Sequence, residues 1–205
     1  QKIGYAFNKF HVIHNGIDIK RKSYKKYLNL LTKKDIKICS IGRNNPQKNR
    51  IYFINIVKEL SKSLSIESLI LGKGVSRSPE LKKFCNLSAI KLDLKESIKD
   101  IGKIFDEIDI LIVTSVYGEG CPNVIIEALK NGILVFSTDV GDAKYILGDD
   151  RFIIPSNNYQ IAANKIKQVA LSNNIDSLII DSRLRSDKLF NERRMSREYD
   201  KIWFA

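Results

Sequence analysis

Short apolar runs alternate along the chain with stretches of helical periodicity, and no other feature restricts the fold as much. The runs have the length of strands and are mostly continuous, as in strands buried on both faces of a parallel sheet. They span Lys37 to Ile41, Ser68 to Leu71, Ala89 to Leu92, Asp109 to Thr114, Ile133 to Ser137 and Phe152 to Ile154. The sequence therefore predicts an α/β fold, with a parallel sheet that carries helices on both faces.

Local signals agree on where the helices begin. Ser78-Pro79-Glu80 offers an N-cap, a first-turn proline and an acidic first turn, and Cys121-Pro122 places a proline in a similar way. Another helix is predicted over Asn158 to Leu171, and apolar residues at helical spacing predict a last one over Ser182 to Trp203. The apolar face of that last helix needs a partner surface.

The chain is strongly basic. Lys and Arg total 35 and Asp and Glu total 23, so the formal net charge is +12. Such an excess favours an anionic partner, which could be a phosphorylated ligand, a nucleic acid or an acidic membrane surface. A high lysine content without functional cause explains the charge equally well.

The cysteines and the apolar runs bear on cellular location. Cys39, Cys85 and Cys121 lie far apart with no C-x-x-C spacing, which argues against a disulfide framework or a zinc site and favours a reducing cytoplasm. No apolar stretch approaches the roughly 20 residues of a membrane span. Because the first residue is Gln1 and the only methionine is Met195, we expect the sequence to be part of a longer protein.

The most informative segment runs from Tyr117 to Ala128 and follows the strand that ends near Ser115. It places a polar loop at the carboxyl end of a strand, where open α/β sheets bind ligands. A helix that begins at Pro122 directs free backbone N–H groups and about half a unit of positive charge at the same point. An anion such as phosphate is expected there.

The helix after this loop carries one narrow polar stripe on an otherwise apolar surface. Glu127 lies about 7.5 Å along the axis from Pro122, within reach of a ligand at the helix start. Its carboxylate can accept hydrogen bonds from the hydroxyl groups of a sugar or a ribose. The stripe consists of Asn123, Glu127, Lys130 and Asn131. The alternative is that Glu119 and Glu127 are solvated charges beside an ordinary turn.

A second polar loop, Gly42 to Asn49, leaves the strand Lys37 to Ile41 and could converge on the same ligand. Arg43 offers a planar fork for phosphate oxygens and Lys48 a mobile point charge, although either could be ordinary surface charge. Gly72-Lys73-Gly74 ends a third strand, but a lone G-x-G is a weak signal.

Together these motifs resemble the retaining family-4 (group 1) glycosyltransferases, over nearly the whole chain. Gly42-Arg43 with Lys48-Asn49 resembles the phosphate-binding loop of that family, and Glu119 to Glu127 resembles its E-x7-E motif. His14 to Asp18 resembles an N-G-x-D element near the junction of two lobes, with His14 in place of a frequent proline. Thr138 to Asp142 follows in the expected place, with an aspartate where a second glycine is common. The resemblance implies a Rossmann-like domain that forms the C-terminal half of a two-lobed GT-B fold.

The resemblance also implies roles for individual residues. Arg43 and Lys48 would hold the donor diphosphate, Glu119 would meet the sugar and phosphate, and these three would form the catalytic set. Leu94, in the loop expected after Ala89 to Leu92, resembles a position that contacts the nucleobase, although Asp93 stands where glycine is common. Ribose hydroxyls would bind the second glutamate of the motif. The donor-binding set is Gly42, Arg43, Lys48, Leu94, Glu119, Gly120, Cys121, Pro122, Asn123 and Glu127.

By the same resemblance, residues 1–18 form an interdomain junction, residues 19–181 the nucleotide-sugar-binding domain, and residues 182–205 a C-terminal helix that packs toward a missing N-terminal lobe. The implied reaction transfers a hexosyl group with retention from a UDP- or GDP-sugar to an acceptor hydroxyl, in polysaccharide, glycoconjugate or lipid-linked glycan synthesis. No cofactor or metal is expected, and His11 and His14 have no further ligand at metal spacing. This chain alone would bind the donor without turning it over.

Other functions stay open. The basic stretch Lys20 to Lys26 would suit a non-catalytic nucleotide- or nucleic-acid-binding module, although the chain has no known nucleic-acid motif and no nucleic acid is expected. Another GT-B enzyme, such as a sugar epimerase, would share the fold. The basic charge could also hold a cytoplasmic enzyme at the anionic inner face of the membrane.

Overall fold

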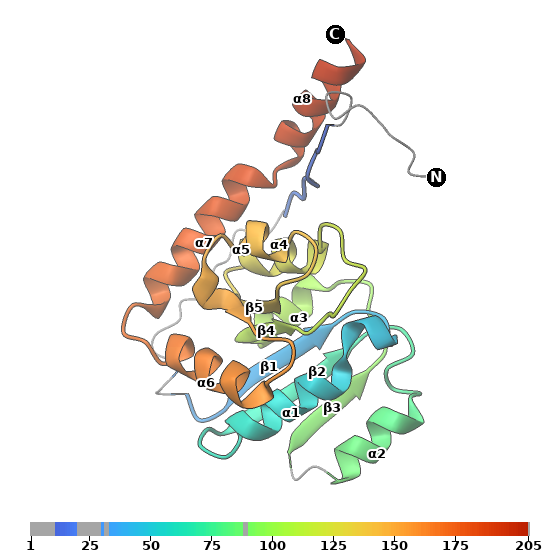
Figure 1. Ribbon diagram of the computed structural model, residues 1–205, viewed down its shortest axis with the longest axis vertical. Coiled ribbons are helices and arrows are strands. Elements are labelled where there is room, and N and C mark those ends of the chain that lie inside the picture. The colour runs from blue at the N-terminus through green and yellow to red at the C-terminus, as the bar shows by residue number, and fades with distance from the viewer. Residues whose placement is uncertain (1–10, 20–29, 31–32, 88–89, 205) are drawn as a thin grey trace.

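The computed structural model describes residues 11–19, 30, 33–87 and 90–204, and it confirms the predicted α/β fold (Figure 1). In this described part of the chain, six parallel strands form one sheet in the order β3-β2-β1-β4-β5-β6. The strands are β1 (Ile36–Ile41), β2 (Ile66–Leu71), β3 (Lys91–Lys95), β4 (Ile110–Val113), β5 (Leu134–Thr138) and β6 (Ile153–Ile154). Because the strand order reverses between β1 and β4, the sheet has a topological switch point there.

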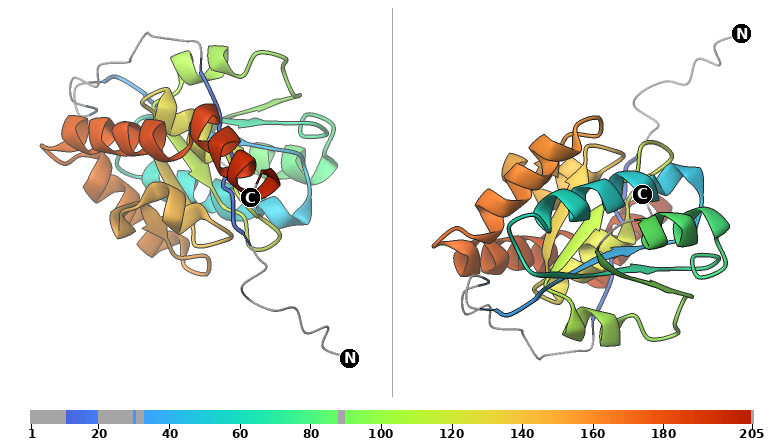
Figure 2. Two further views of the ribbon diagram at one scale, coloured as in Figure 1. Left: turned by 90° about the horizontal axis from the view of Figure 1, so that it is seen from above. Right: turned by 90° about the horizontal axis from the view of Figure 1, so that it is seen from below.

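Helices cover both faces of the sheet, as the crossover connections of parallel strands require (Figures 1 and 2). On one face lie α1 (Arg50–Leu60), α2 (Pro79–Leu87) and α6 (Tyr159–Ala170), and on the other α3 (Gly102–Glu107), α4 (Asn123–Lys130) and α7 (Ile175–Leu189). The short α5 (Ala143–Leu147) follows β5, and α8 (Glu192–Trp203) extends away from the sheet. None of the described helices has both the length and the hydropathy that a bilayer crossing requires.

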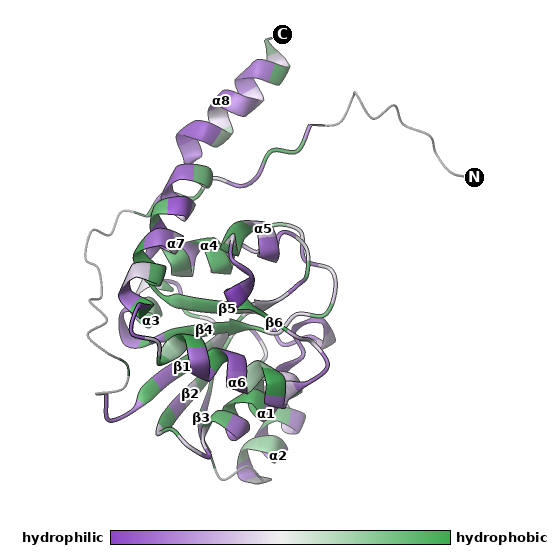
Figure 3. Cartoon of the chain, turned by 60° about the vertical axis from the view of Figure 1, so that its left-hand side comes forward, coloured by the Kyte–Doolittle hydropathy of each residue, from purple (hydrophilic) through white to green (hydrophobic). Residues whose placement is uncertain are grey.

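The central strands form the core between these layers. Every residue of β4 and of β5 is buried, and Figure 3 shows both strands as largely hydrophobic. Phe53 of α1 packs into this core, as does Phe136 of β5. Burial from both sides explains why the strands read as continuous apolar runs in the sequence.

The predicted helix starts are confirmed. α2 begins at Pro79, and the Ser78 hydroxyl accepts a hydrogen bond from Leu81 N at 3.3 Å. α4 begins directly after Pro122, and α6 begins after Asn158, whose side chain accepts from Ile161 N at 2.9 Å. At these residues the loops end, because N-caps and prolines favour the start of a helix.

The third strand differs from its prediction. It spans Lys91–Lys95 instead of Ala89 to Leu92, and Ala89 lies outside the described residues, as does the basic stretch Lys20 to Lys26. β3 is an edge strand in which exposed and half-buried residues alternate, so a search for continuous apolar runs misses most of it. Leu94 therefore lies inside the strand, paired with Ile70, and its predicted place in a loop is wrong.

The C-terminal segment also differs from its prediction. The expected single helix over Ser182 to Trp203 is two helices, and position 182 lies inside α7. The helix is interrupted at Phe190, which is fully buried, and at Asn191. The Asn191 side chain caps α8 by accepting a hydrogen bond from Arg194 N at 2.8 Å. The spacing of apolar residues alone does not reveal an interruption between two helices, because it is helical on both sides.

Residues 11–19 lie across the joint between α7 and α8. Ile17 N donates to Phe190 O at 2.8 Å, and Asp18 accepts from the backbone N–H of Glu192 at 3.4 Å. A Cβ at Gly16 would lie 2.6 Å from Asn191 O, so a glycine is needed for this close approach. Residues of the N-G-x-D element are thus hydrogen-bonded to the joint between the last two helices.

Candidate functional site

The two polar loops predicted at strand ends meet at the switch point of the sheet. β1 and β4 are neighbours, with Ile38 paired to Ile110, yet α1 and α4 lie on opposite faces. Such a point opens a crevice beyond the carboxyl ends of the strands, where α/β proteins bind ligands. The loop after β1 brings Arg43 and Lys48 to this end of the sheet, and the loop after β4 brings Glu119.

Lys48 and Glu119 form an ion pair across the two loops. Their side chains keep 17% and 11% of their exposure, so the pair is largely shielded and still reachable. Ser115 Oγ donates to the same carboxylate oxygen, Oε1, at 2.7 Å, and within the described chain Oε2 accepts no hydrogen bond. An ammonium has three donors, so the pair keeps N–H groups and an acceptor oxygen for a ligand.

Contacts to the backbone fix the two loops against each other. Thr114 Oγ1 donates to Lys48 O at 2.8 Å, and Val116 N donates to Gln47 O at 3.0 Å. The third strand end supports them from behind, because a Cβ at Gly72 would lie 1.8 Å from Gly42 O. The Gly72-Lys73-Gly74 turn therefore supports the loop after β1, which is more than its weak motif indicated.

The segment Thr138 to Asp142 supports the loop that carries Glu119. A Cβ at Gly141 would lie 2.4 Å from Glu119 O and from Gly120 O, and the φ of Gly141 is +56°, so this position requires glycine. Asp142 N donates to Gly120 O at 2.8 Å. The φ of Asp142 is −85°, which any residue adopts, and so the aspartate is tolerated where a second glycine is common.

The start of α4 is free for a ligand. α1, α6 and α8 each have an asparagine side chain that caps the first turn. α4 begins after the buried Pro122, with exposed Gly120 and half-buried Cys121 before it, and no side chain among the described residues caps it. An anion can take the place of the missing cap, because the first N–H groups of a helix have no acceptor within it.

Asn123, the first residue of α4, is exposed. Its Oδ1 accepts a hydrogen bond at 2.7 Å from the side chain of Asn15, which belongs to the N-G-x-D element. The amide N–H groups of Asn123 are then available to an anion. This contact links the junction segment to the start of α4.

Three other predicted site residues do not contact the Lys48–Glu119 pair. Arg43 is exposed on the same loop, and within the described chain its guanidinium has no partner. Glu127 is half-buried and lines a cavity of about 410 Å³ together with α3 and residues 17–19. Burial raises the pKa of its carboxyl above the ordinary value. Leu94 packs against the core from the edge strand.

One member of the predicted polar stripe of α4 is buried. Lys130 is 7% exposed because α7 packs on α4, and its ammonium lies 3.4 Å from the carboxylate of Asp187 in α7. Asn123, Glu127 and Asn131 stay at least partly exposed. The stripe therefore ends at the contact with α7, which helical periodicity could not show.

In the part of the chain that the structure describes, no three His, Cys, Asp or Glu side chains lie together as a metal site would need. His14 instead stacks on Tyr145 with ring centroids 4.5 Å apart and lies 3.5 Å from an oxygen of Asp142. These contacts connect the junction segment to α5.

Sequence reasoning missed two polar residues of the site. Ser115 is fully buried behind Glu119, and Arg50 is buried behind the loop after β1, where its Nη2 donates to Gly42 O at 2.6 Å. A serine at the end of an apolar strand and an arginine at the start of an apolar helix both read as boundary residues. Their position next to the two predicted loops was the available signal.

The sequence matches the family model described as glycosyl transferases group 1 over residues 35–172. A similar fold occurs in a glycosyltransferase from Rickettsia africae ESF-5, at 21% identity and a TM-score of 0.71, over 82% of this chain and 47% of that one. It also occurs in Anabaena HepE in complex with UDP and glucose, at 15% identity and a TM-score of 0.73, over 84% of this chain and 49% of that one.

A third similar structure is the C-terminal domain of a group 1 family glycosyl transferase, LpcC, from Francisella tularensis. It has 18% identity and a TM-score of 0.65, over 77% of this chain and 87% of that one. This chain thus spans about half the length of the Rickettsia and Anabaena proteins. None of the curated proteins matches the sequence.

Proposed function

Because the chain belongs to the group 1 glycosyltransferases, we propose that it is the donor-binding part of a retaining enzyme that transfers a hexosyl group from a nucleotide-diphosphate sugar. The observation that carries this proposal is the Lys48–Glu119 pair at the switch point of the sheet. A cation suited to the diphosphate and a carboxylate suited to sugar hydroxyls lie side by side there, next to the uncapped start of α4. Retention rests on the family resemblance of the motifs.

In the proposed reaction the bond between the anomeric carbon and the diphosphate breaks, so negative charge grows on the departing diphosphate. Arg43, Lys48 and the first N–H groups of α4 would stabilise that charge in the transition state. Glu119 would orient the sugar through its free oxygen Oε2. The backbone from Gly120 to Asn123 and the backbone of Gly42 complete the proposed donor site, and the proposal assigns no metal to it.

The nucleoside is assigned to the region beside α4. Glu127 would accept hydrogen bonds from the ribose hydroxyls at the cavity that it lines. Leu94 remains a proposed backbone contact to the nucleobase, now from the end of an edge strand. The complex of Anabaena HepE with UDP and glucose supports UDP-sugars as the first donors to examine, with GDP-sugars as the alternative.

The acceptor is assigned to a further lobe, since this chain spans about half the length of its structural relatives. α8 buries none of its residues, and four large apolar side chains at its end are exposed, namely Tyr199, Ile202, Trp203 and Phe204. They support the proposal that this helix packs against that lobe. The chain alone would then bind a donor and transfer no sugar.

The proposed setting is the cytoplasm, with the enzyme held at the anionic inner face of a membrane where lipid-linked or polysaccharide acceptors are glycosylated. The net charge of +12 supports this. Cosedimentation of the chain with vesicles should rise with their content of anionic lipid. Equal binding to neutral vesicles would contradict the membrane proposal.

Calorimetry of the chain against UDP-glucose, GDP-mannose and ADP-glucose tests the donor proposal. One of the three should bind, and the matching free nucleoside diphosphate should compete with it. Binding should weaken on replacement of Glu119 by Gln, with the exposed Glu107→Gln at the end of α3 as a charge-matched control. Salt-sensitive binding of an oligonucleotide together with no affinity for any nucleotide sugar would support a nucleic-acid-binding module instead.

A further inference from the structure

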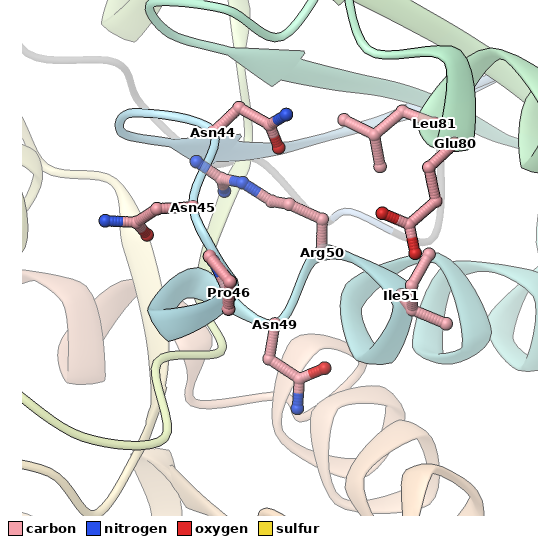
Figure 4. A pocket seen from close by; sticks show the side chains of 8 residues that line it. All are labelled: Asn44, Asn45, Pro46, Asn49, Arg50, Ile51, Glu80 and Leu81. Atoms are coloured by element: carbon pink, nitrogen blue, oxygen red, sulfur yellow. The ribbon is translucent and has the colours of Figure 1, made fainter.

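Arg50 is the first residue of α1, and its guanidinium is buried behind the loop of residues 42–49, which is the proposed phosphate loop. Its side chain reaches from the helix toward Asn44 and Asn45 and lines a pocket of about 290 Å³ with them (Figure 4). Nη1 donates to Ser40 Oγ at 2.5 Å and Nη2 to Gly42 O at 2.6 Å. The residue is 5% exposed, and its Nε has no hydrogen-bond partner among the described residues.

The charge of Arg50 has no counter-charge in the described part of the chain. Both of its hydrogen bonds go to neutral oxygens, and the one carboxylate at the same pocket, Glu80, is exposed and forms no ion pair with it. Burial lowers the pKa of Arg50 to about 10. A buried charge without a partner costs several kcal/mol, so its presence calls for a compensating interaction.

Gly42 brings this charge next to Lys48. A Cβ at Gly42 would lie 3.1 Å from Lys48 Cε and 3.4 Å from Arg50 Nη2, so both cationic side chains flank one glycine. Lys48 is paired with Glu119, whereas Arg50 has no ionic partner among the residues that the structure describes. The phosphate loop is therefore left with surplus positive charge on its inner side.

We propose that Arg50 is a positioning residue for the donor diphosphate, which it serves by holding the Gly42 carbonyl and by placing a buried positive charge behind the loop. The inference rests on the proposed function, because the diphosphate is the anion that would compensate this charge. Arg50 need not touch the ligand. Its hydrogen bonds shape the loop, and its field reaches the diphosphate through a poorly screened interior.

This role makes the effect of Arg50 selective for charged ligands. Arg50→Gln keeps a hydrogen-bond donor for Gly42 O or Ser40 Oγ and removes the charge. Arg50→Lys keeps the charge and loses the planar fork that reaches both oxygens. Lys58→Gln, an exposed site about 12 Å further along α1, removes an equal charge away from the loop and serves as the control.

The test is calorimetry of the four proteins, wild type included, against UDP, GDP, ADP and the matching free nucleoside. For the diphosphate that the wild type binds, Arg50→Gln should lower affinity about tenfold, because the variant loses the buried charge that acts on the diphosphate through a poorly screened interior. Affinity for the nucleoside should stay within about twofold. Lys58→Gln should resemble the wild type, and Arg50→Lys should lie between the wild type and Arg50→Gln.

Equal loss for diphosphate and nucleoside in Arg50→Gln would assign Arg50 a purely structural role and overturn the proposal, as would unchanged diphosphate affinity. If Arg50→Gln does not fold, Arg50→Met, which removes the charge without burying a new polar group, replaces it: unchanged diphosphate affinity in Arg50→Met overturns the proposal, and a loss confined to the diphosphate supports it. A wild type that binds none of the three diphosphates overturns both this inference and the proposed function. Tight diphosphate binding that ignores Arg50 overturns this inference alone.

Discussion

At the scale of single residues, the site consists of side chains that are already paired and side chains that are free. Lys48 and Glu119 hold each other, with Ser115 behind them, whereas Arg43 and Glu127 have no side-chain partner among the described residues. Both loops could be predicted from the sequence, because polar residues that follow parallel strands lie at one edge of the sheet. Ser115 and Arg50 could not be predicted as site residues, because their role depends on which loop lies beside them after folding.

Arg43 should affect transfer without affecting the fold. Arg43→Ala in the complete enzyme should lower the rate of sugar transfer roughly tenfold to a hundredfold, because a charged hydrogen bond contributes about 1.5–3 kcal/mol. The free energy of unfolding should change by less than about 0.5 kcal/mol, since the side chain is exposed. Steady-state kinetics and urea unfolding check the two statements, with Lys82→Ala on α2 as control. An unchanged transfer rate would remove Arg43 from the catalytic set.

Glu127 should make stability depend on pH. Burial raises its pKa above the ordinary 4.5, so its ionisation disfavours the folded state and stability falls as pH rises from that value through the raised pKa. Glu127→Gln should therefore melt above the wild type at pH 7, by no more than about 2 °C because the group is partly exposed, and match it at pH 4. Thermal unfolding across this pH range is the measurement, and a higher melting temperature for the wild type at pH 7 would contradict it. Nucleoside binding should weaken in the same variant.

At the scale of elements, the site depends on close packing between strand-end loops. Gly72→Ala would place a Cβ 1.8 Å from Gly42 O, so the turn after β2 and the phosphate loop would have to separate. We expect a loss of about 2 to 4 kcal/mol in the free energy of unfolding, measured in urea, together with weaker UDP binding. Gly120→Ala is the matched control for stability, because nothing lies within 4 Å of its added Cβ. Equal stability of the two variants would mean that the loops are not in fixed contact.

The elements themselves could be predicted to different degrees. β4 and β5 are buried throughout, and β1 and β2 over most of their residues, so their apolar runs identify them and their order along the chain implies parallel pairing. β3 lies at an edge and alternates between exposed and half-buried residues. It has no continuous apolar run, so its predicted range began and ended too early and Leu94 was assigned to a loop. The break between α7 and α8 and the burial of Lys130 both follow from contacts between helices, and a single periodicity does not contain that information.

At the scale of the whole molecule, the positive charge should make donor binding independent of divalent metal. Lys48, Arg43 and the start of α4 offer the cations and N–H groups that a diphosphate needs, within a chain of net charge +12. UDP affinity in calorimetry should therefore be the same with EDTA and with magnesium, and it should fall as salt increases. Affinity that disappears with EDTA and returns with magnesium would show that the site uses a metal.

The stretch from His14 to Asp18 is in contact with the start of α4, with α5 and with the joint between α7 and α8. Through these contacts the stretch connects the start of α4 to α8. If α8 tilts relative to the sheet, the stretch must either release one of these anchors or drag Asn123 with it. Donor binding at the start of α4 and the tilt of α8 would then be coupled through this stretch, and the coupling would not have to pass through the core.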